Sequence, residues 1–172
     1  SERKVRQYSS VANDATPTNI DADILPVLEY WQQGCKGQFA PTWQDFRLED
    51  LPPRLIPQCA VVDVIDDGDD FRYRFWGTDR EVLQGRDMTG KSVRELCPSD
   101  LTDLVWEEYA EILKRRNPIW FEITAHIDDS HEFQFQYLRM PLRGDGQNID
   151  RIFGICRNRY SPRELESTFP IT

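Results

Sequence analysis

Five segments with the residue alternation of β-strands place the strongest constraint on how this chain folds. They are residues 58–65, 71–76, 119–127, 133–142 and 149–156. Acidic or glycine-containing turns separate neighbouring segments at residues 66–70, 128–130 and 144–146. Short turns join antiparallel strands, whereas parallel strands need long crossover connections. We therefore expect an antiparallel sheet built from two strands, a helical middle and then three strands.

One of these segments changes phase along its length. Its large side chains are Phe133, Phe135 and Tyr137, followed by Leu138, Met140 and Leu142. Successive residues of a strand point to opposite faces of the sheet, so a shift of one residue moves the apolar set to the other face. We expect a β-bulge at this shift.

Two stretches outside the strands have the period of amphipathic helices. Ile24, Leu28 and Trp31 share one face of the first, which covers about residues 22–34. The second covers about residues 99–116, before an Asn-Pro pair that ends it. We expect the apolar face of the first helix to pair with a second copy of the chain or with another protein.

The 172 residues make up the length of one domain, and their net charge is −9. A negative protein repels phosphate backbones, so we do not expect a nucleic-acid partner, and we interpret the basic residues Arg3, Lys4 and Arg6 as solvated. No apolar run approaches the roughly 18–20 residues that cross a bilayer, and no secretory signal is recognisable. We expect a cytoplasmic protein with no membrane partner.

Sites of catalysis and metal binding are not recognisable from residue spacing. The cysteines contain no Cys-x-x-Cys pair and read as reduced, small apolar residues; they are Cys35, Cys59, Cys97 and Cys156. His126 and His131 flank an acidic turn and could bind a metal, although exposed loop residues are the favoured interpretation. No Ser-His-Asp set, carboxylate pair or activated cysteine is recognisable. We therefore expect no metal and no enzyme.

Residues 85–92 match the P-loop pattern Gly-x-x-x-x-Gly-Lys-Ser. The pattern predicts a nucleotide-binding enzyme in which Lys91 contacts phosphates. A P-loop needs a buried strand before it and a long helix after it, and neither flank is predicted here. Asp87 would also place a carboxylate where phosphate sits. We interpret the segment as a turn in which Lys91 is replaceable and Gly85 and Gly90 act through backbone geometry.

The order of these elements and several short motifs resemble the PAS domain superfamily. Gly90, Lys91 and Ser92, followed by Pro98 and Asp100, resemble the Gly-Lys-Ser run and the Pro-x-Asp start of the PAS connecting helix. The chain resembles the bacterial PAS_5-type subfamily over roughly residues 24–157. Further residues that carry this resemblance are Trp31, Pro41, Phe46, Phe71 to Thr78, Leu96, Met140 to Leu142 and Gly146.

The resemblance implies an α+β fold, with a PAS-like five-stranded antiparallel sheet, flanking helices and an N-terminal helical extension. The expected parts are a polar N-terminal arm (1–21), the helical extension (22–56), the PAS-like core (57–158) and a C-terminal tail (159–172) that forms a short helix or strap. PAS domains are often homodimers and often hold a small molecule in an internal pocket. The cofactor is unknown, since neither the Asn-Cys-Arg-Phe-Leu run of the flavin-binding type nor the middle-helix histidine of the haem type is present.

Aromatic side chains are the candidates for lining such a pocket. They are Trp76, Trp106, Tyr109, Phe121, Phe135 and Tyr137. The alternative is that these rings only fill the core. The favoured function is a stand-alone sensory or regulatory domain that binds a small molecule, forms a homodimer, or does both. A ligand-free protein–protein interaction module is the alternative, and a nucleotide enzyme is the third hypothesis.

Overall fold

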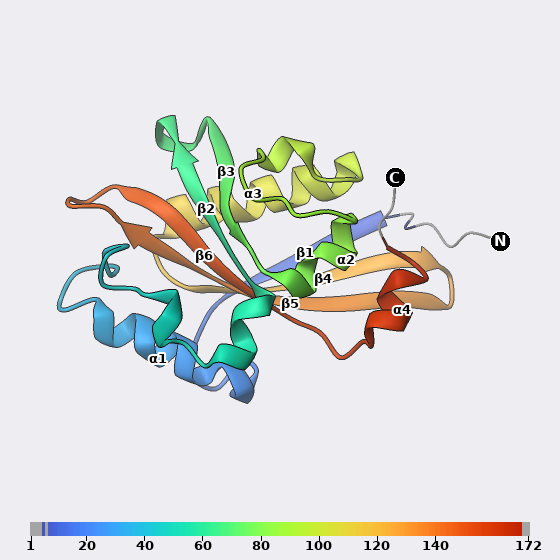
Figure 1. Ribbon diagram of the computed structural model, residues 1–172, viewed down its shortest axis with the longest axis horizontal. Coiled ribbons are helices and arrows are strands. Elements are labelled where there is room, and N and C mark those ends of the chain that lie inside the picture. The colour runs from blue at the N-terminus through green and yellow to red at the C-terminus, as the bar shows by residue number, and fades with distance from the viewer. Residues whose placement is uncertain (1–4, 6, 170–172) are drawn as a thin grey trace.

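The structure is a computed structural model that describes residue 5 and residues 7–169. Its centre is one antiparallel six-stranded sheet with the strand order β1-β4-β5-β6-β2-β3 (Figure 1). The strands are β1 (Gln7–Asp14), β2 (Cys59–Ile65), β3 (Asp70–Trp76), β4 (Ile119–Asp128), β5 (His131–Arg143) and β6 (Ile149–Arg157). The α-helices are α1 (Leu25–Gly34), α2 (Glu81–Gln84), α3 (Ser99–Arg115) and α4 (Pro162–Glu166). The predicted α+β class, antiparallel sheet and flanking helices are confirmed.

The sixth strand lies in the segment that the sequence indicated as a polar arm. β1 pairs with β4 over its whole length, from Gln7 opposite His126 to Asp14 opposite Ile119. Most β1 side chains are exposed, so the strand has no apolar alternation that would reveal it. Backbone hydrogen bonds to β4 hold it at the edge of the sheet. The basic cluster Arg3, Lys4 and Arg6 lies outside the described residues.

Both faces of the sheet are buried. One face packs against α3 and the C-terminal segment, and the other packs against α1 and the 3₁₀ turns around residues 48–58 (Figure 1). On the α1 face the Trp31 indole N–H donates a hydrogen bond to the Pro141 carbonyl at 2.8 Å. Ile24 and Leu28 are fully buried and Trp31 is 6% exposed. The helix face that we expected to form a dimer is therefore covered by the chain's own sheet, which corrects that expectation.

Burial of both faces also explains the phase shift in β5. Its register with β4 and β6 continues unbroken through Tyr137 and Leu138, so the predicted β-bulge at this point is wrong. Tyr137 belongs to the core on the α3 face, whereas Leu138 and Met140 belong to the core on the α1 face. The large residues move from odd-numbered to even-numbered positions at residue 138, because from there on α1 and its neighbours cover the face to which the even-numbered side chains point. Arg139 consequently points to the α3 face.

The glycine-rich segment at residues 85–92 lies along the outer edge of β3. Gly85 and Gly90 have positive φ angles of 71° and 84°. The Gly90 N–H donates to the Tyr73 carbonyl at 2.7 Å, and the Tyr73 N–H donates to the Lys91 carbonyl at 2.9 Å. The prediction that these glycines act through backbone geometry is confirmed. No strand–loop–helix unit of a P-loop surrounds them in this described segment.

The C-terminal tail forms the expected short helix and strap. In α4, Ser161 and Glu164 form a capping box at the first turn. Leu165, and Phe169 beyond the helix, insert into the core on the α3 face. Within the described residues, no helix combines the length and apolar character needed to cross a membrane.

Candidate functional site

Charged side chains lie inside the core between the sheet and α3. Of the residues that the structure describes, Arg80, Glu108 and Arg139 are the charged ones that are buried, with exposures of 4%, 3% and 1%. They come from different elements: the 3₁₀ turn Thr78–Arg80, α3 and β5. Removing a charge from water is costly unless a partner of opposite charge compensates it. These three residues therefore mark the interior as a candidate site.

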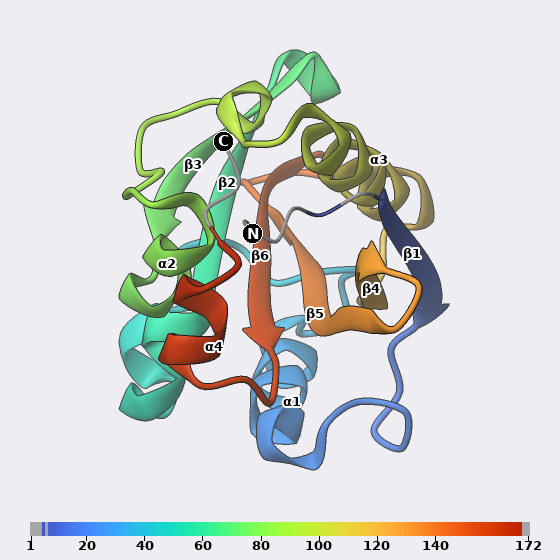
Figure 2. The same cartoon turned by 90° about the vertical axis from the view of Figure 1, so that its right-hand side faces the viewer.

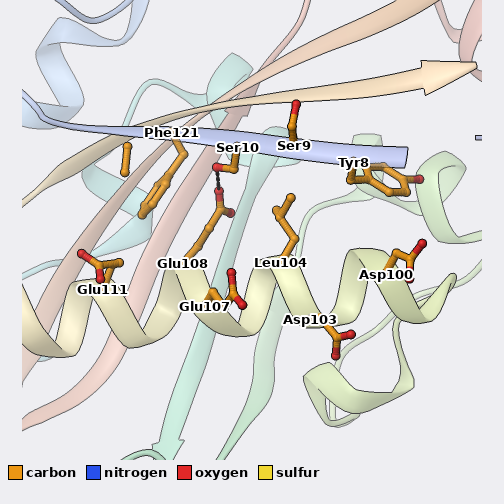
Figure 3. Close-up of a pocket in the computed structure, with 11 residues that line it drawn as sticks. Tyr8, Ser9, Ser10, Asp100, Asp103, Leu104, Glu107, Glu108, Glu111 and Phe121 are labelled. Carbon is orange, nitrogen blue, oxygen red and sulfur yellow. Dashed lines mark hydrogen bonds between the residues drawn. The ribbon is translucent and has the colours of Figure 1, made fainter. Parts of the chain in front are cut away.

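Arg139 is fully engaged by neighbouring side chains. Its Nη2 and Nε donate to Glu108 Oε1 at 2.9 and 3.2 Å. Ser10 of β1 donates to the second carboxylate oxygen of Glu108 at 2.8 Å (Figure 3). Nη1 of Arg139 donates to the Tyr109 hydroxyl at 3.4 Å, and that hydroxyl donates to the Tyr73 hydroxyl at 3.3 Å. The Glu108 carboxylate and the Tyr109 hydroxyl thus accept the hydrogen bonds of this guanidinium.

Burial shapes the acid–base behaviour of the groups around Arg139. It raises the pKa of the Glu108 carboxyl, while Arg139 and the Ser10 hydrogen bond act in the opposite direction. It also raises the pKa of the Tyr73 and Tyr137 hydroxyls well above the ordinary value of a phenol. Both phenols are therefore neutral near pH 7 and contribute dipoles rather than charge.

Arg80 has a different environment. Its guanidinium carbon lies 4.4 Å from the centre of the Trp76 ring and 5.4 Å from that of Tyr137, in the range of cation–π contacts. Its Nε and Nη1 are buried and have no hydrogen-bond partner among the described residues. The Trp76 Nε1 is likewise buried and without a partner in the part of the chain described. Every unsatisfied atom of this pair is a donor.

The structure gathers four of the six predicted pocket residues around the two arginines. Trp76 and Tyr137 contact Arg80. The Arg139 guanidinium carbon lies 4.8, 4.6 and 5.9 Å from the ring centres of Tyr109, Tyr137 and Phe121. These rings do more than fill space, because they form the walls around buried charge.

Trp106 and Phe135, the other two predicted pocket residues, lie apart from the arginines. Trp106 packs edge-on against Phe71 and is covered by the Arg94 guanidinium at 4.9 Å. Phe135 packs against Tyr160 and Phe169 of the C-terminal segment, with ring centres 5.8 and 5.7 Å away. Phe135 therefore lies where the C-terminal segment covers the α3 face of the sheet.

A groove of about 380 Å³ runs between the C-terminal segment and the turn that carries Arg80. α4 lies beside α2 at this place (Figure 2). Thr78 and Asp79, the two residues before Arg80, line the groove. Its other lining residues include Gln58, Val82, Arg157, Tyr160, Pro162 and Leu165. The groove thus reaches the turn from outside, while Arg80 is buried on the inside.

A second groove, of about 440 Å³, lies between β1 and α3 and is acidic (Figure 3). Its carboxylates are Asp100, Asp103, Glu107, Glu108 and Glu111. Glu108 is buried and turned toward Ser10, whereas the other four are exposed or half-buried and therefore hydrated. This negative surface disfavours the approach of anions from the β1 side.

The family model described as a PAS domain (PAS_5) matches residues 22–157. This chain belongs to the PAS domain family. The comparison with curated proteins found no match.

Three solved structures that are similar to this PAS domain have 13–16% sequence identity to it. A light-oxygen-voltage domain studied with a flavin analogue has a TM-score of 0.43 and 16% identity, over 61% of this chain and 78% of that chain. An RNA-binding light-oxygen-voltage receptor has a TM-score of 0.49 and 13% identity, over 94% of this chain and 41% of that one. The N-terminal domain of a diguanylate cyclase with a PAS/PAC sensor from Marinobacter aquaeolei has a TM-score of 0.38 and 15% identity, over 58% and 94% of the two chains.

The interior of this PAS domain does not fit the cysteine-based flavin site that the sequence resemblance raised. The connecting helix α3 contains no cysteine. All four cysteines are free; Cys97 is exposed, and Cys59 and Cys156 are buried in strands of the sheet. The ion pair of Glu108 and Arg139 occupies the space between α3 and β5.

The histidines lie together at the β4–β5 turn. His131 Nδ1 is 2.8 Å from Asp128 Oδ1, and His126 Nδ1 is 3.6 Å from a carboxylate oxygen of Glu132. The hydrogen bond from the Ser130 backbone N–H, followed by the one from His131, holds the pKa of Asp128 well below its ordinary value. Over the described residues there is no group of three or more His, Cys, Asp and Glu side chains placed to hold a metal.

Sequence reasoning missed the three buried charges. Arg139 continues the odd-numbered series of Phe133, Phe135 and Tyr137 that faces α3. Strict alternation would have placed it inside, but the large residues at 138, 140 and 142 suggested a change of phase. Arg80 lies in a turn, where sequence periodicity carries no information on burial.

Proposed function

We propose that this PAS domain is a sensory or regulatory module that binds a small molecule in its interior, on the α3 side of the sheet. The observation that carries the proposal is the set of buried donors on Arg80 and Trp76 that find no partner in the described chain. Buried polar groups in folded proteins are almost always hydrogen-bonded, and exceptions often mark binding sites. The protein is proposed to act through binding rather than catalysis.

Native mass spectrometry of the purified full chain tests this proposal. The expected result is a retained small molecule that disappears when the protein is denatured. A mass equal to the bare chain, together with no thermal shift across a metabolite panel, would overturn the binding function. It would instead favour a ligand-free interaction module.

Homodimerisation is the second part of the proposal, and the free edge of the sheet favours it. Among the described strands, none pairs with the outer edge of β1, and Val11 on this strand is 58% exposed. The unpaired backbone groups of an edge strand are a template for another strand. We expect Val11→Lys to weaken a dimer in light scattering, because lysine on an edge strand opposes pairing. A dimer that withstands this change uses another surface. The cytoplasmic location and bacterial origin stay predictions from the sequence.

A further inference from the structure

We propose that Arg80 and Trp76 bind the carboxylate of a small organic anion inside the domain. This inference rests on the proposed small-molecule binding function and names the chemical class of the ligand. It begins from charge: the described core contains two buried guanidinium groups and one buried carboxylate. Glu108 forms an ion pair with Arg139, and the two side chains are 3% and 2% exposed. Arg80 is therefore the buried guanidinium without a carboxylate partner in the described core.

Arginine side chains keep their positive charge in proteins, so the burial of Arg80 places a charge in the core. The contacts with Trp76 and Tyr137 compensate for only part of the lost hydration, since a cation–π contact is weaker than the hydration of a full charge. A water molecule would satisfy hydrogen bonds at this position but would leave the charge unmatched. An anion supplies both the hydrogen-bond acceptors and the missing negative charge.

The number of unsatisfied donors favours an anion that offers more than one acceptor atom. The Nε and Nη1 atoms of Arg80 are the unsatisfied pair. These two nitrogens are not one fork, because the N–H of Nε lies beside Nη2, so each of them needs an acceptor atom of its own; a carboxylate supplies two acceptor oxygens together with a negative charge. The indole N–H of Trp76 can only donate, so it also requires an acceptor. Three donor atoms and no unsatisfied acceptor on these two side chains therefore describe a receptor for a negatively charged group.

The surrounding side chains indicate what the anion is attached to. The Trp76 and Tyr73 rings pack edge-on with their centres 4.9 Å apart, and the centre of the Tyr137 ring lies 5.4 Å from the Arg80 guanidinium carbon. Burial keeps the two phenols neutral. Flat apolar surfaces of this kind favour an aromatic or aliphatic body over a strongly hydrated inorganic ion.

The groove under α4 gives a route to this site. Thr78 and Asp79 line it, and Arg80 is the next residue of the same turn. α4 is five residues long, and Leu165 is the residue by which it is anchored in the core. We expect the interior to be uncovered when this short helix moves together with Phe169, which follows it and is also buried in the core.

Thermal shift and isothermal titration with sodium benzoate test the proposal on the full chain. Benzamide serves as the neutral analogue of the same shape, and inorganic phosphate as the anion without an apolar body. We expect benzoate to raise the unfolding temperature and to bind at least about 10-fold more tightly than benzamide, as a charge-assisted hydrogen bond implies. Arg80→Met should abolish the preference for benzoate.

Arg94→Met is the matched control, because Arg94 also covers a tryptophan but lies at the surface. It should bind benzoate like the wild type. Trp76→Phe keeps the ring and removes the indole donor, so it tests the site without removing the charge, and it should weaken benzoate binding without abolishing it. Circular dichroism of each variant verifies that it is folded.

Three results would overturn the carboxylate assignment: no benzoate response in the wild type, equal responses in the wild type and Arg80→Met, or a response to phosphate alone. Small-molecule binding and the carboxylate assignment are tested by different outcomes. A neutral molecule retained by both the wild type and Arg80→Met in native mass spectrometry would leave the binding function intact while disproving the anion.

Discussion

The two buried arginines of this PAS domain lie on the same side of the sheet and differ in what surrounds them. Arg139 contacts a carboxylate and a hydroxyl, whereas two nitrogens of Arg80 lie near aromatic rings and have no acceptor among the residues that the structure describes. The described chain supplies a counter-charge and hydrogen-bond acceptors to Arg139. It supplies neither to Nε and Nη1 of Arg80. Burial of charge alone therefore does not identify a binding site; the missing partner does.

The largest expected effect comes from breaking the ion pair of Glu108 and Arg139. Glu108→Gln should lower the free energy of unfolding by about 3–5 kcal/mol, because it leaves Arg139 buried without a counter-charge. Arg80→Met, measured in the absence of ligand, should change it by less than about 1 kcal/mol or increase it, since the cation–π contacts with Trp76 and Tyr137 are lost but no ion pair is broken and the burial of an unsatisfied charge is relieved. Urea unfolding monitored by fluorescence gives both values. Equal losses in the two variants would remove the distinction between the two arginines.

The second effect tests whether Glu108 and Arg139 form a closed pair. The double variant Glu108→Leu with Arg139→Met replaces both charges by apolar side chains and should recover most of the stability that either single change loses, to within about 1–2 kcal/mol of the wild type. A double-mutant cycle measures the coupling energy directly. Additive losses would mean that the two side chains do not act together.

A smaller effect is expected from the hydroxyl next to Arg139. Tyr109→Phe removes one acceptor from Arg139 and one donor to Tyr73, and should cost about 1 kcal/mol. The same change should leave benzoate binding at Arg80 unaltered, because Tyr109 belongs to the surroundings of Arg139. A loss of benzoate affinity in Tyr109→Phe would show that the two sites are one.

The smallest effect concerns the cysteine that lies within the field of Arg80. Burial raises the pKa of the Cys59 thiol to about 12, and Arg80 acts in the opposite direction. The thiol is therefore protonated at pH 8, and we expect iodoacetamide to modify the exposed Cys97 first and Cys59 only after unfolding. Peptide mass spectrometry over a time course measures the order. Arg80→Met should not speed the reaction of Cys59, whereas faster modification would indicate that the variant opens the core.

Periodicity predicted most of this fold because most of its elements bury one regular face. The hairpin of β2 and β3, the three later strands and α3 all follow this rule. β1 was missed because an edge strand held by backbone hydrogen bonds needs no apolar alternation. The burial of both faces of β5 was missed because it depends on α1, which is far away in the sequence.

The candidate site was predicted only in its aromatic part. Large rings are expected in any core, so Trp76, Tyr109, Phe121 and Tyr137 could be named from composition and pattern. A charged residue is ordinarily assigned to the surface, and its burial depends on partners contributed by other elements. Glu108 illustrates this, since its hydrogen bonds join α3 to β1 and β5.

β1 lies outside the segment that the family model matches, yet one of its side chains forms a hydrogen bond with a buried residue of the core. Ser10 on this strand holds the Glu108 carboxylate, which in turn holds Arg139. A force that peels β1 from β4 would therefore break a bond to the interior ion pair before it disturbed the rest of the sheet. The pairing of this edge strand and the hydrogen bonding of the buried ion pair are therefore coupled through one serine hydroxyl.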